Sequence, residues 1–410
     1  MEDLNPAGPS ARPAGGEALD TRLVHHAYRA PADFDAQPVG VYKASTVFFP
    51  TVAAMRSRDW KDKSAYTYGL HGTPTTFTLE ERLATLEGGL HCVLAPSGLA
   101  AIALVNMAFL SAGDEVLLPD NAYGPGKSLA EGELRRWGVT HRYYDPMNPV
   151  DLANKLSPAT RLVWLEAAGS VTLEFPDMPA LVRVVQEANA DRETDARVLT
   201  ALDNTWGAGI AFCAFDVGVD LSMQALTKYP SGGADVLMGS VVSRDERLHR
   251  QLLLTHMRLG LGVGANDAEL VLRGLPSVGL RYRAQDEATR ALARWMAGQP
   301  AVERVFHPSL PDSPGHDVWL RDARGAACLF SVVFQPSILP EAVDRFCDGL
   351  RLFRLGYSWA GPVSLCVPYD IPAMRTQPWP HPARLVRFAV GLEAVDDLRA
   401  DLDQALALLG

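Results

Sequence analysis

The 410-residue chain lacks any apolar run that approaches the roughly 20 residues a membrane-spanning helix needs. Its N-terminus also lacks the basic and then apolar pattern of a secretory signal. Positive charge is in deficit, because 38 Lys and Arg stand against 48 Asp and Glu, for a net charge of -10. Nucleic acids and anionic membranes are therefore poor partners. We expect a cytoplasmic protein that acts on small molecules.

Cysteine is scarce, and its spacing excludes two classes of site. The five cysteines are scattered, odd in number and never spaced C-x-x-C: Cys92, Cys213, Cys328, Cys347 and Cys366. This spacing indicates neither a disulfide framework nor a zinc site. We expect reduced, mostly buried thiols and no bound metal. Cys213 lies close in sequence to the polar residues discussed below, Asp203 and Lys228, but we expect it to be a core thiol.

The length exceeds that of a single hydrophobic core, so two or three packed units are expected. Residues 1–18 are rich in Pro, Gly and Ala, which predicts disorder. We divide the chain into an arm (1–72), a large domain (73–274) and a small α+β domain (275–410). Strands alternate with helices over residues 91–242, which predicts an α/β protein with a mostly parallel sheet and helices on both faces.

Two polar residues between Leu202 and Val242 are placed for chemistry. Asp203 follows an apolar run that predicts a strand, and Lys228 stands just before the turn Ser231-Gly232-Gly233. An Asp at the carboxyl end of a parallel strand lies where open α/β sheets bind ligands. The pair suits pyridoxal 5′-phosphate (PLP): Lys228 would bond covalently to its aldehyde, and Asp203 would keep its ring nitrogen protonated. Taken singly, the two would be a surface lysine and a helix-capping aspartate.

These segments resemble the PLP-attachment region of the Cys/Met-metabolism enzymes. D-N-T-W-x-x-G, T-K-Y and G-L-E-x-V-x-D-L are specific in combination, and the resemblance runs from about residue 41 to the C-terminus. It implies PLP as the cofactor and fold type I of the PLP-dependent transferases, with a seven-stranded sheet. Thr227 would add a hydroxyl to the cofactor phosphate.

A second segment predicts where the phosphate binds. An apolar strand at 91–95 leads through Ser97 and Gly98 into a buried helix that begins at Leu99. Free backbone N–H groups and the helix dipole favour an anion at such a helix start. A Ser-Gly pair alone is a weak signal. Here it stands where the resembled family has its S-G-x-x-A phosphate loop, which implies that Ser97, Gly98 and Leu99 bind the phosphate.

Two tyrosines match further family positions. Tyr123 follows a predicted strand, 115–118, where an aromatic ring can stack on a flat cofactor; taken alone, it would be half-buried packing. Tyr68 lies in a segment rich in Gly, Thr and aromatics, 64–76. In the family this segment reaches the neighbouring subunit, where the Tyr contacts the phosphate. The resemblance therefore implies a homo-oligomer, at least a dimer and expected as a dimer of dimers.

The phosphate contacts depart from the family pattern at two positions. Leu70 replaces an Arg that grips the phosphate, and Ala225 replaces a Ser three residues before the lysine. His71 either replaces that Arg in part or is a loop histidine satisfied by the backbone. One alternative is therefore a non-catalytic relative that no longer binds the cofactor, because these phosphate contacts are missing.

Arg387 and the segment Tyr357-Ser358-Trp359 point to the substrate. Arg387 lies within a predicted apolar strand, so it needs a carboxylate partner, which is either an internal acid or an amino-acid substrate. It stands in the R-x-x-[IV]-G-L-E frame of the family's substrate-carboxylate Arg. Tyr-Ser-Trp is typical of the family's β-lyases. There Ser358 would help to hold the α-carboxylate, and Trp359 would shape the pocket.

The resemblance therefore predicts a PLP-dependent carbon–sulfur β-lyase that cleaves L-cystathionine in methionine biosynthesis. Lys228, Tyr123 and Tyr68 are the expected catalytic residues. A γ-lyase or γ-synthase relative on the same fold is the first alternative. A nucleotide-dependent α/β oxidoreductase is another, but no predicted strand precedes the G-L-G-V-G run at 260–264, so the dinucleotide fingerprint fails.

Overall fold

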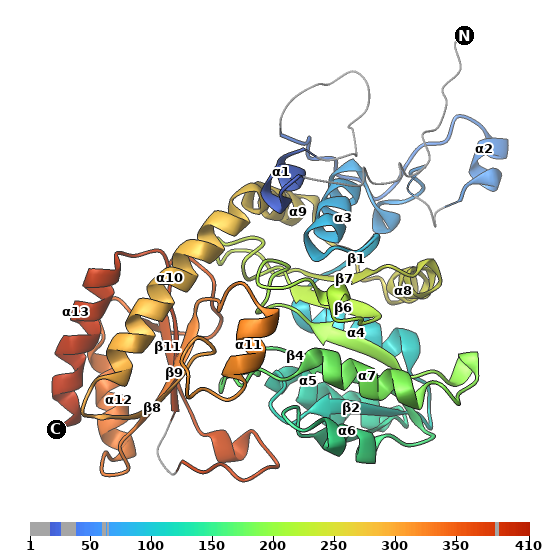
Figure 1. The fold of residues 1–410 in the computed structure, drawn as a ribbon. Coiled ribbons are helices and arrows are strands. Elements are labelled where there is room, and N and C mark those ends of the chain that lie inside the picture. Colours follow the sequence, from blue (N-terminus) through green and yellow to red (C-terminus); the bar gives the residue numbers. More distant parts are fainter. Residues whose placement is uncertain (1–16, 26–37, 60–62, 64, 382–384) are drawn as a thin grey trace.

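The computed structural model describes residues 17–25, 38–59, 63, 65–381 and 385–410 (Figure 1). The disorder predicted for residues 1–18 falls almost wholly outside the described residues. The described chain builds two sheets, one from residues 91–243 and one from residues 302–389. The proposed division at residues 72 and 274 stays a prediction. None of the described helices has the length and apolar composition needed to cross a membrane.

The larger sheet has seven strands in the order β1-β7-β6-β5-β4-β2-β3. Only β7 is antiparallel to its neighbours, so the predicted mostly parallel sheet is confirmed. Its strands are β1 (His91–Ala95), β2 (Glu115–Pro119), β3 (Thr140–Tyr144), β4 (Thr160–Glu166), β5 (Leu199–Asp203), β6 (Leu221–Ala225) and β7 (Gly239–Ser243).

Helices cover both faces of this sheet, as predicted. Apolar side chains from α3, α7 and α9 enter the core on one face, and those from α4 and α8 enter the core on the other. The helices of this part are α3 (Pro74–Glu87), α4 (Gly98–Phe109), α5 (Gly124–Leu129), α6 (Pro149–Lys155), α7 (Met178–Ala188), α8 (Glu246–Leu259) and α9 (Ala265–Gly274).

The ends of α3 and α4 follow from local sequence. Thr73 and Thr76 form a reciprocal capping box before α3, and Gly88 ends this helix in a left-handed conformation. The Ser97 hydroxyl accepts a hydrogen bond from Ala100 N at 3.0 Å and so caps α4. A glycine is required at position 98, because a Cβ there would lie 2.6 Å from Ala225 Cβ.

Helix α10 (Val278–Ala297) leads to the second sheet, whose five strands lie in the order β10-β11-β12-β9-β8 (Figure 1). Stacked and edge-to-face phenylalanines, among them Phe330, Phe346 and Phe388, form its core with α12 and α13. The elements are β8 (Val302–Phe306), α11 (His316–Asp322), β9 (Leu329–Phe334), α12 (Pro340–Gly349), β10 (Arg354–Leu355), β11 (Leu365–Tyr369), β12 (Leu385–Ala389) and α13 (Val395–Leu406).

The described part of the arm is mostly irregular, although the β-branched and aromatic composition of residues 41–49 is typical of an extended segment. Residues 41–49 contain a single isolated bridge, between Thr46 and Tyr68, instead of a strand. Before it lies a short helix, α1 (Leu19–Val24). A further short helix, α2 (Val52–Ser57), follows in the arm.

Candidate functional site

Lys228 lies in the turn after β6, and its amine points at the segment between β10 and β11. Its Nζ donates a hydrogen bond to Ser358 Oγ at 2.6 Å and lies 5.4 Å from the centre of the Trp359 ring. Burial, with the nearby positive charge of Arg387 as a second cause, lowers the pKa of Lys228 to about 8. An amine with this pKa can exchange a proton near neutrality.

Asp203 is the last residue of β5, as the sequence predicted, and lies beside Glu166 in the register of β4 and β5. One of its carboxyl oxygens accepts a hydrogen bond from Thr205 N at 3.0 Å. Burial raises the pKa of Asp203, while the Thr205 hydrogen bonds and the charge of Lys228 oppose this rise. Asp203 and Lys228 therefore occupy the ends of the neighbouring strands β5 and β6.

A small hollow opens at these strand ends, lined in part by Tyr123, Ile102, Trp164, Glu166 and Asp203. The Tyr123 side chain is 43 % exposed and stands at the start of α5. Its backbone N–H donates to Glu166 Oε2 at 2.8 Å, which fixes the loop that carries the phenol ring. The structure thus places Tyr123 and Asp203 around the same space.

The predicted phosphate loop lies against the lysine segment. Gly98 contacts Ala225, and a Cβ at Gly239 would lie 2.4 Å from Ser97 O, so the start of α4 sits close to β6 and β7. The first N–H groups of a helix have no intrahelical partner, and here they belong to Gly98 and Leu99. The Ser97 hydroxyl is occupied in capping its own helix, and the Thr227 hydroxyl accepts from Met238 N at 3.5 Å.

Arg387 is 7 % exposed on β12 and lies near Lys228. Its Nη2 donates to Ser358 O at 3.1 Å, and its guanidinium lies 5.4 Å from the Tyr369 ring centre. Among the described residues, Nε has no hydrogen-bond partner and no carboxylate pairs with the guanidinium. Burial lowers the pKa of Arg387, although an Arg stays charged. An internal acid, one of the two partners left open by the sequence, is not among the described contacts.

Ser358 and Trp359 connect the lysine to the arginine. Ser358 has a φ of 87°, which is uncommon for a residue with a side chain and is often found at functional sites. Its hydroxyl accepts from Lys228 while its carbonyl accepts from Arg387. The hydroxyl expected to help hold a carboxylate is therefore hydrogen-bonded to the lysine here. Trp359 packs edge-on against Tyr229, with ring centres 5.6 Å apart.

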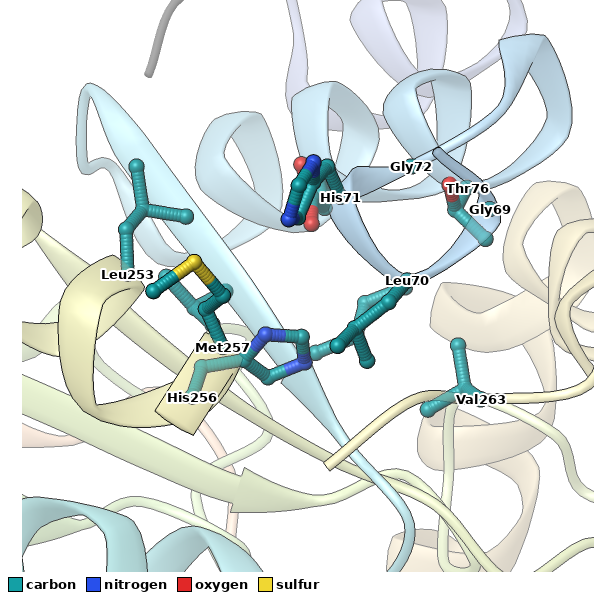
Figure 2. A pocket seen from close by; sticks show the side chains of 12 residues that line it. Gly69, Leu70, His71, Gly72, Thr76, Leu253, His256, Met257 and Val263 are labelled. Carbon is teal, nitrogen blue, oxygen red and sulfur yellow. The ribbon is translucent and has the colours of Figure 1, made fainter. Parts of the chain in front are cut away.

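Tyr68 is not placed around the hollow that contains Asp203. It precedes the turn Gly69–His71 and is 47 % exposed, with its ring edge-on to that of His71. Leu70 and His71 line a second pocket with residues of α3 and α8, among them His256, as Figure 2 shows. His71 Nδ1 shares a hydrogen bond with Thr67 Oγ1 at 2.8 Å. His71 therefore has a partner within its own turn, and this pocket lies apart from the one that holds Asp203.

Two residues of the site carried no assigned role in the sequence. Glu166 stands at the end of a strand, and nothing in the sequence indicated its contact with Tyr123. Burial and the neighbouring Asp203 raise the pKa of Glu166 well above its usual value. Tyr369 is the last residue of β11, and the sequence did not indicate its role, because its contact with Arg387 depends on the pairing of β11 with β12.

The chemistry of this donor set fits PLP. The aldehyde needs a reactive amine, the ring nitrogen needs a carboxylate and the phosphate needs N–H donors. Lys228, Asp203 and the start of α4 supply these groups at or just beyond the carboxyl ends of the parallel strands β6, β5 and β1, which meet at one edge of the sheet. The unpaired Nε of buried Arg387 fits a carboxylate that comes from outside the chain.

Comparisons with known proteins agree with this chemistry. The model of the family described as Cys/Met metabolism PLP-dependent enzyme matches residues 20–407. The cystathionine beta-lyase MetC of Escherichia coli K12 is 38% identical over 395 residues, which cover 95% of this chain and 98% of that protein.

Solved structures give the same result for the fold. The crystal structure of metB from Corynebacterium glutamicum has a TM-score of 0.87 at 26% identity and covers 96% of this chain and 99% of that chain. That of cystathionine gamma synthase from Xanthomonas oryzae pv. oryzae has a TM-score of 0.86 at 29% identity, with the same coverage. The fold is that of the type I PLP-dependent enzymes, with a second, smaller sheet.

Proposed function

Because this chain belongs to the Cys/Met metabolism family of PLP-dependent enzymes, we propose that it cleaves L-cystathionine to homocysteine, pyruvate and ammonia. It is a PLP-dependent lyase, and the proposal specifies elimination at Cβ of a cysteine conjugate. The observation that carries it is the Tyr357-Ser358-Trp359 segment, which brings Ser358 and Trp359 to the Lys228 amine. The name of the relative that is 38% identical to this chain supports the same substrate.

Arg387 binds the α-carboxylate of the amino-acid substrate. A buried guanidinium with an unpaired Nε gains two charge-assisted hydrogen bonds when a carboxylate enters. The Ser358 carbonyl, at 3.1 Å from Nη2, holds the guanidinium in a fixed orientation before the substrate arrives. Because Arg387 and Lys228 both contact Ser358, a substrate held by its carboxylate at Arg387 would bring its Cα toward the Lys228 amine.

Lys228 carries the proton. PLP, when bound, supplies the conjugated ring that takes up negative charge from Cα. With PLP bound and the substrate in place, the Lys228 amine would remove the Cα proton, for which its lowered pKa suits it. The hydrogen bond to Ser358 holds Nζ in place during this transfer. Asp203 would hold the ring nitrogen, and Tyr123, which lines the same hollow, would stack on the ring.

The cofactor phosphate is held by the start of α4 and by Thr227. Ser97 positions that start through its cap, and Gly98 and Leu99 offer their N–H groups. Tyr68, which is half exposed and apart from its own chain's hollow, completes the site of a neighbouring subunit. The functional unit is therefore a homo-oligomer, at least a dimer and built as a homotetramer. We also propose that it acts in the cytoplasm.

Trp359 favours β over γ elimination. Its ring lies over the Lys228 amine and against Tyr229, which narrows the space for the substrate beyond Cβ. A γ-lyase or γ-synthase activity on the same fold is the alternative, and the similarity to a cystathionine gamma synthase structure gives it weight.

Product analysis tests the proposal. L-Cystathionine is added to PLP-saturated protein, with a Lys228→Ala variant as the control that should form no product. Pyruvate with homocysteine supports β elimination. 2-Oxobutyrate with cysteine would show γ chemistry and contradict the role given to Trp359.

A further inference from the structure

A buried polar cluster lies next to the end of β5, on the face of the sheet opposite the candidate site, and takes no part in that site. It comprises Glu87, Asn204, Ser222 and Gln224, each at most 1 % exposed. Strand alternation places Ser222 and Gln224 on the face of the larger sheet that α3 covers, whereas Asp203 projects from the opposite face into the hollow. The cluster therefore lies directly behind Asp203.

Glu87 links the ends of two neighbouring strands. It is the last residue of α3, and its Oε2 accepts hydrogen bonds from Asn204 Nδ2 at 2.9 Å and from Ser222 Oγ at 2.8 Å. Asn204 directly follows Asp203, and its backbone N–H donates to Met223 O on β6 at 2.8 Å. A change at Glu87 therefore acts on Asp203 through one intervening residue.

The surroundings of Glu87 favour the carboxylic acid over the carboxylate. Among the described residues, no cation forms an ion pair with it, and its Oε1 has no hydrogen-bond partner. The C-terminal end of a helix disfavours negative charge, and an unpaired buried carboxylate is costly. Burial, reinforced by Asp203 and opposed by the two hydrogen bonds, raises the pKa of Glu87 to about 7.

Among the residues that the structure describes, no other element around Glu87 supplies a counter-charge to its carboxyl group. The Cys213 thiol donates to the Glu87 backbone carbonyl at 3.2 Å, and Arg244 Nε donates to the carbonyl of Gly88 at 2.9 Å. Cys92 on β1 is a buried thiol whose pKa burial raises, so it stays neutral. These groups contact the backbone or carry no charge.

The cluster also has fewer unpaired donor atoms than unpaired acceptor atoms. Within the described structure, Asn204 Oδ1 is buried without a partner, and neither amide atom of Gln224 is paired. An acid proton on Glu87 Oε1 supplies one donor, and buried water can satisfy the remaining atoms.

We propose that Glu87 is a positioning residue for Asp203: it holds Asp203 in place through Asn204 and Ser222, and in its neutral form it leaves the negative charge on Asp203. Two adjacent buried carboxyl groups do not both ionise readily. Asp203 ionises first, because Thr205 N donates to it at 3.0 Å and the charge of Lys228 favours its carboxylate. The inference rests on the proposed function in one respect, the pairing of Asp203 with the ring nitrogen of PLP.

Glu87→Gln and Glu87→Ala separate the charge of this residue from its hydrogen bonds. The readouts are the dissociation constant of PLP and the absorption band of the bound cofactor, followed across neutral pH. Glu87→Gln keeps a neutral acceptor, so PLP affinity should stay within about twofold of wild type. Because glutamine does not ionise, a pH-dependent change of the cofactor's absorption band that arises from ionisation of Glu87 should be absent from this variant. Glu87→Ala leaves two buried donors unpaired and should weaken PLP binding about tenfold.

Glu80→Gln is the matched control, because Glu80 is another buried glutamate of α3 but pairs with Lys63 at 2.8 Å instead of contacting β5. It should leave PLP affinity and the band unchanged. If Glu87→Ala does not fold, Ser222→Ala removes one of the two hydrogen bonds without a change of charge and should weaken PLP binding several-fold.

Three outcomes would overturn the role of Glu87. The first is that Glu87→Ala and Ser222→Ala both bind PLP with wild-type affinity. The second is that Glu87→Gln loses as much PLP affinity as Glu87→Ala, and the third is that Glu80→Gln loses as much as Glu87→Ala. A wild-type protein that shows no PLP band would instead overturn the proposed function, and with it the pairing of Asp203.

Discussion

Two arginines lie where the part of the chain that forms the smaller sheet meets the larger sheet, and their partners differ. Arg375 donates to both carboxyl oxygens of Glu174, at 2.8 and 3.0 Å, and also to the Thr172 hydroxyl. Arg387 is the more deeply buried of the two, and it contacts a backbone carbonyl and an aromatic ring, with Nε unpaired within the described structure.

The comparison distinguishes an arginine that stabilises the fold from an arginine whose charge is available to bind a ligand. Although burial opposes it, the contact with Arg375 holds the pKa of Glu174 below its usual value, so this pair is complete within the chain. A buried charge without a partner lowers stability, and such a cost is typical of a site that awaits a charged ligand. Arg387 fits the second description.

The largest expected effect comes from Arg387→Ala. Loss of a charge-assisted pair worth about 2–3 kcal/mol should lower kcat/KM by about 100-fold, mainly through KM. Thermal stability should hold or rise, because an unpaired buried charge is removed. Steady-state kinetics and a thermal melt check this, and an unchanged KM would remove the proposed carboxylate contact.

Arg375→Ala should show the opposite pattern. It leaves Glu174 buried without its partner, which should destabilise the fold by about 3 kcal/mol in denaturant unfolding. At temperatures where the variant stays folded, KM should change little. The double variant Arg375→Met with Glu174→Gln is the control and should recover most of the stability, since neither charge then remains. Equal effects of the two single arginine variants on KM would erase the distinction between the two sites.

The smallest effect concerns the pH dependence of kcat. Lys228 must lose its proton to act as a base, so kcat should rise with pH through about 8. Arg387 helps to lower this pKa, and its removal should move the rise to higher pH by less than about one unit, because burial remains the larger cause. A rise that moves to lower pH in Arg387→Ala would contradict the electrostatic contact.

The sequence predicted the residues whose roles depend on local order. Asp203 at a strand end, Lys228 before a Gly-rich turn and Ser97 at a helix start follow from apolar runs and turn residues that lie next to one another. The strand that carries Arg387 was predicted for the same reason. The family motifs around these positions then indicated that all of them serve the binding and chemistry of PLP.

Contacts between distant segments could not be predicted in this way. Ser222 and Gln224 place polar side chains inside β6, so this strand lacks an apolar signal, and the acceptor of Ser222 lies 135 residues away, on Glu87. The segment 41–49 has the composition of a strand but no neighbour in either sheet, so it stays irregular. Burial of Glu87 and the position of Tyr369 emerge only from the packed structure.

The identity of the PLP-bearing lysine tests the central claim most directly. PLP-saturated protein is treated with borohydride, which makes the link between lysine and cofactor permanent, and is then digested and mapped by mass spectrometry. The account predicts the cofactor's mass on the peptide that contains Lys228 and its absence from a Lys228→Ala variant. The cofactor on another lysine, or equal labelling of the variant, would contradict the assignment on which the site and its proposed chemistry depend.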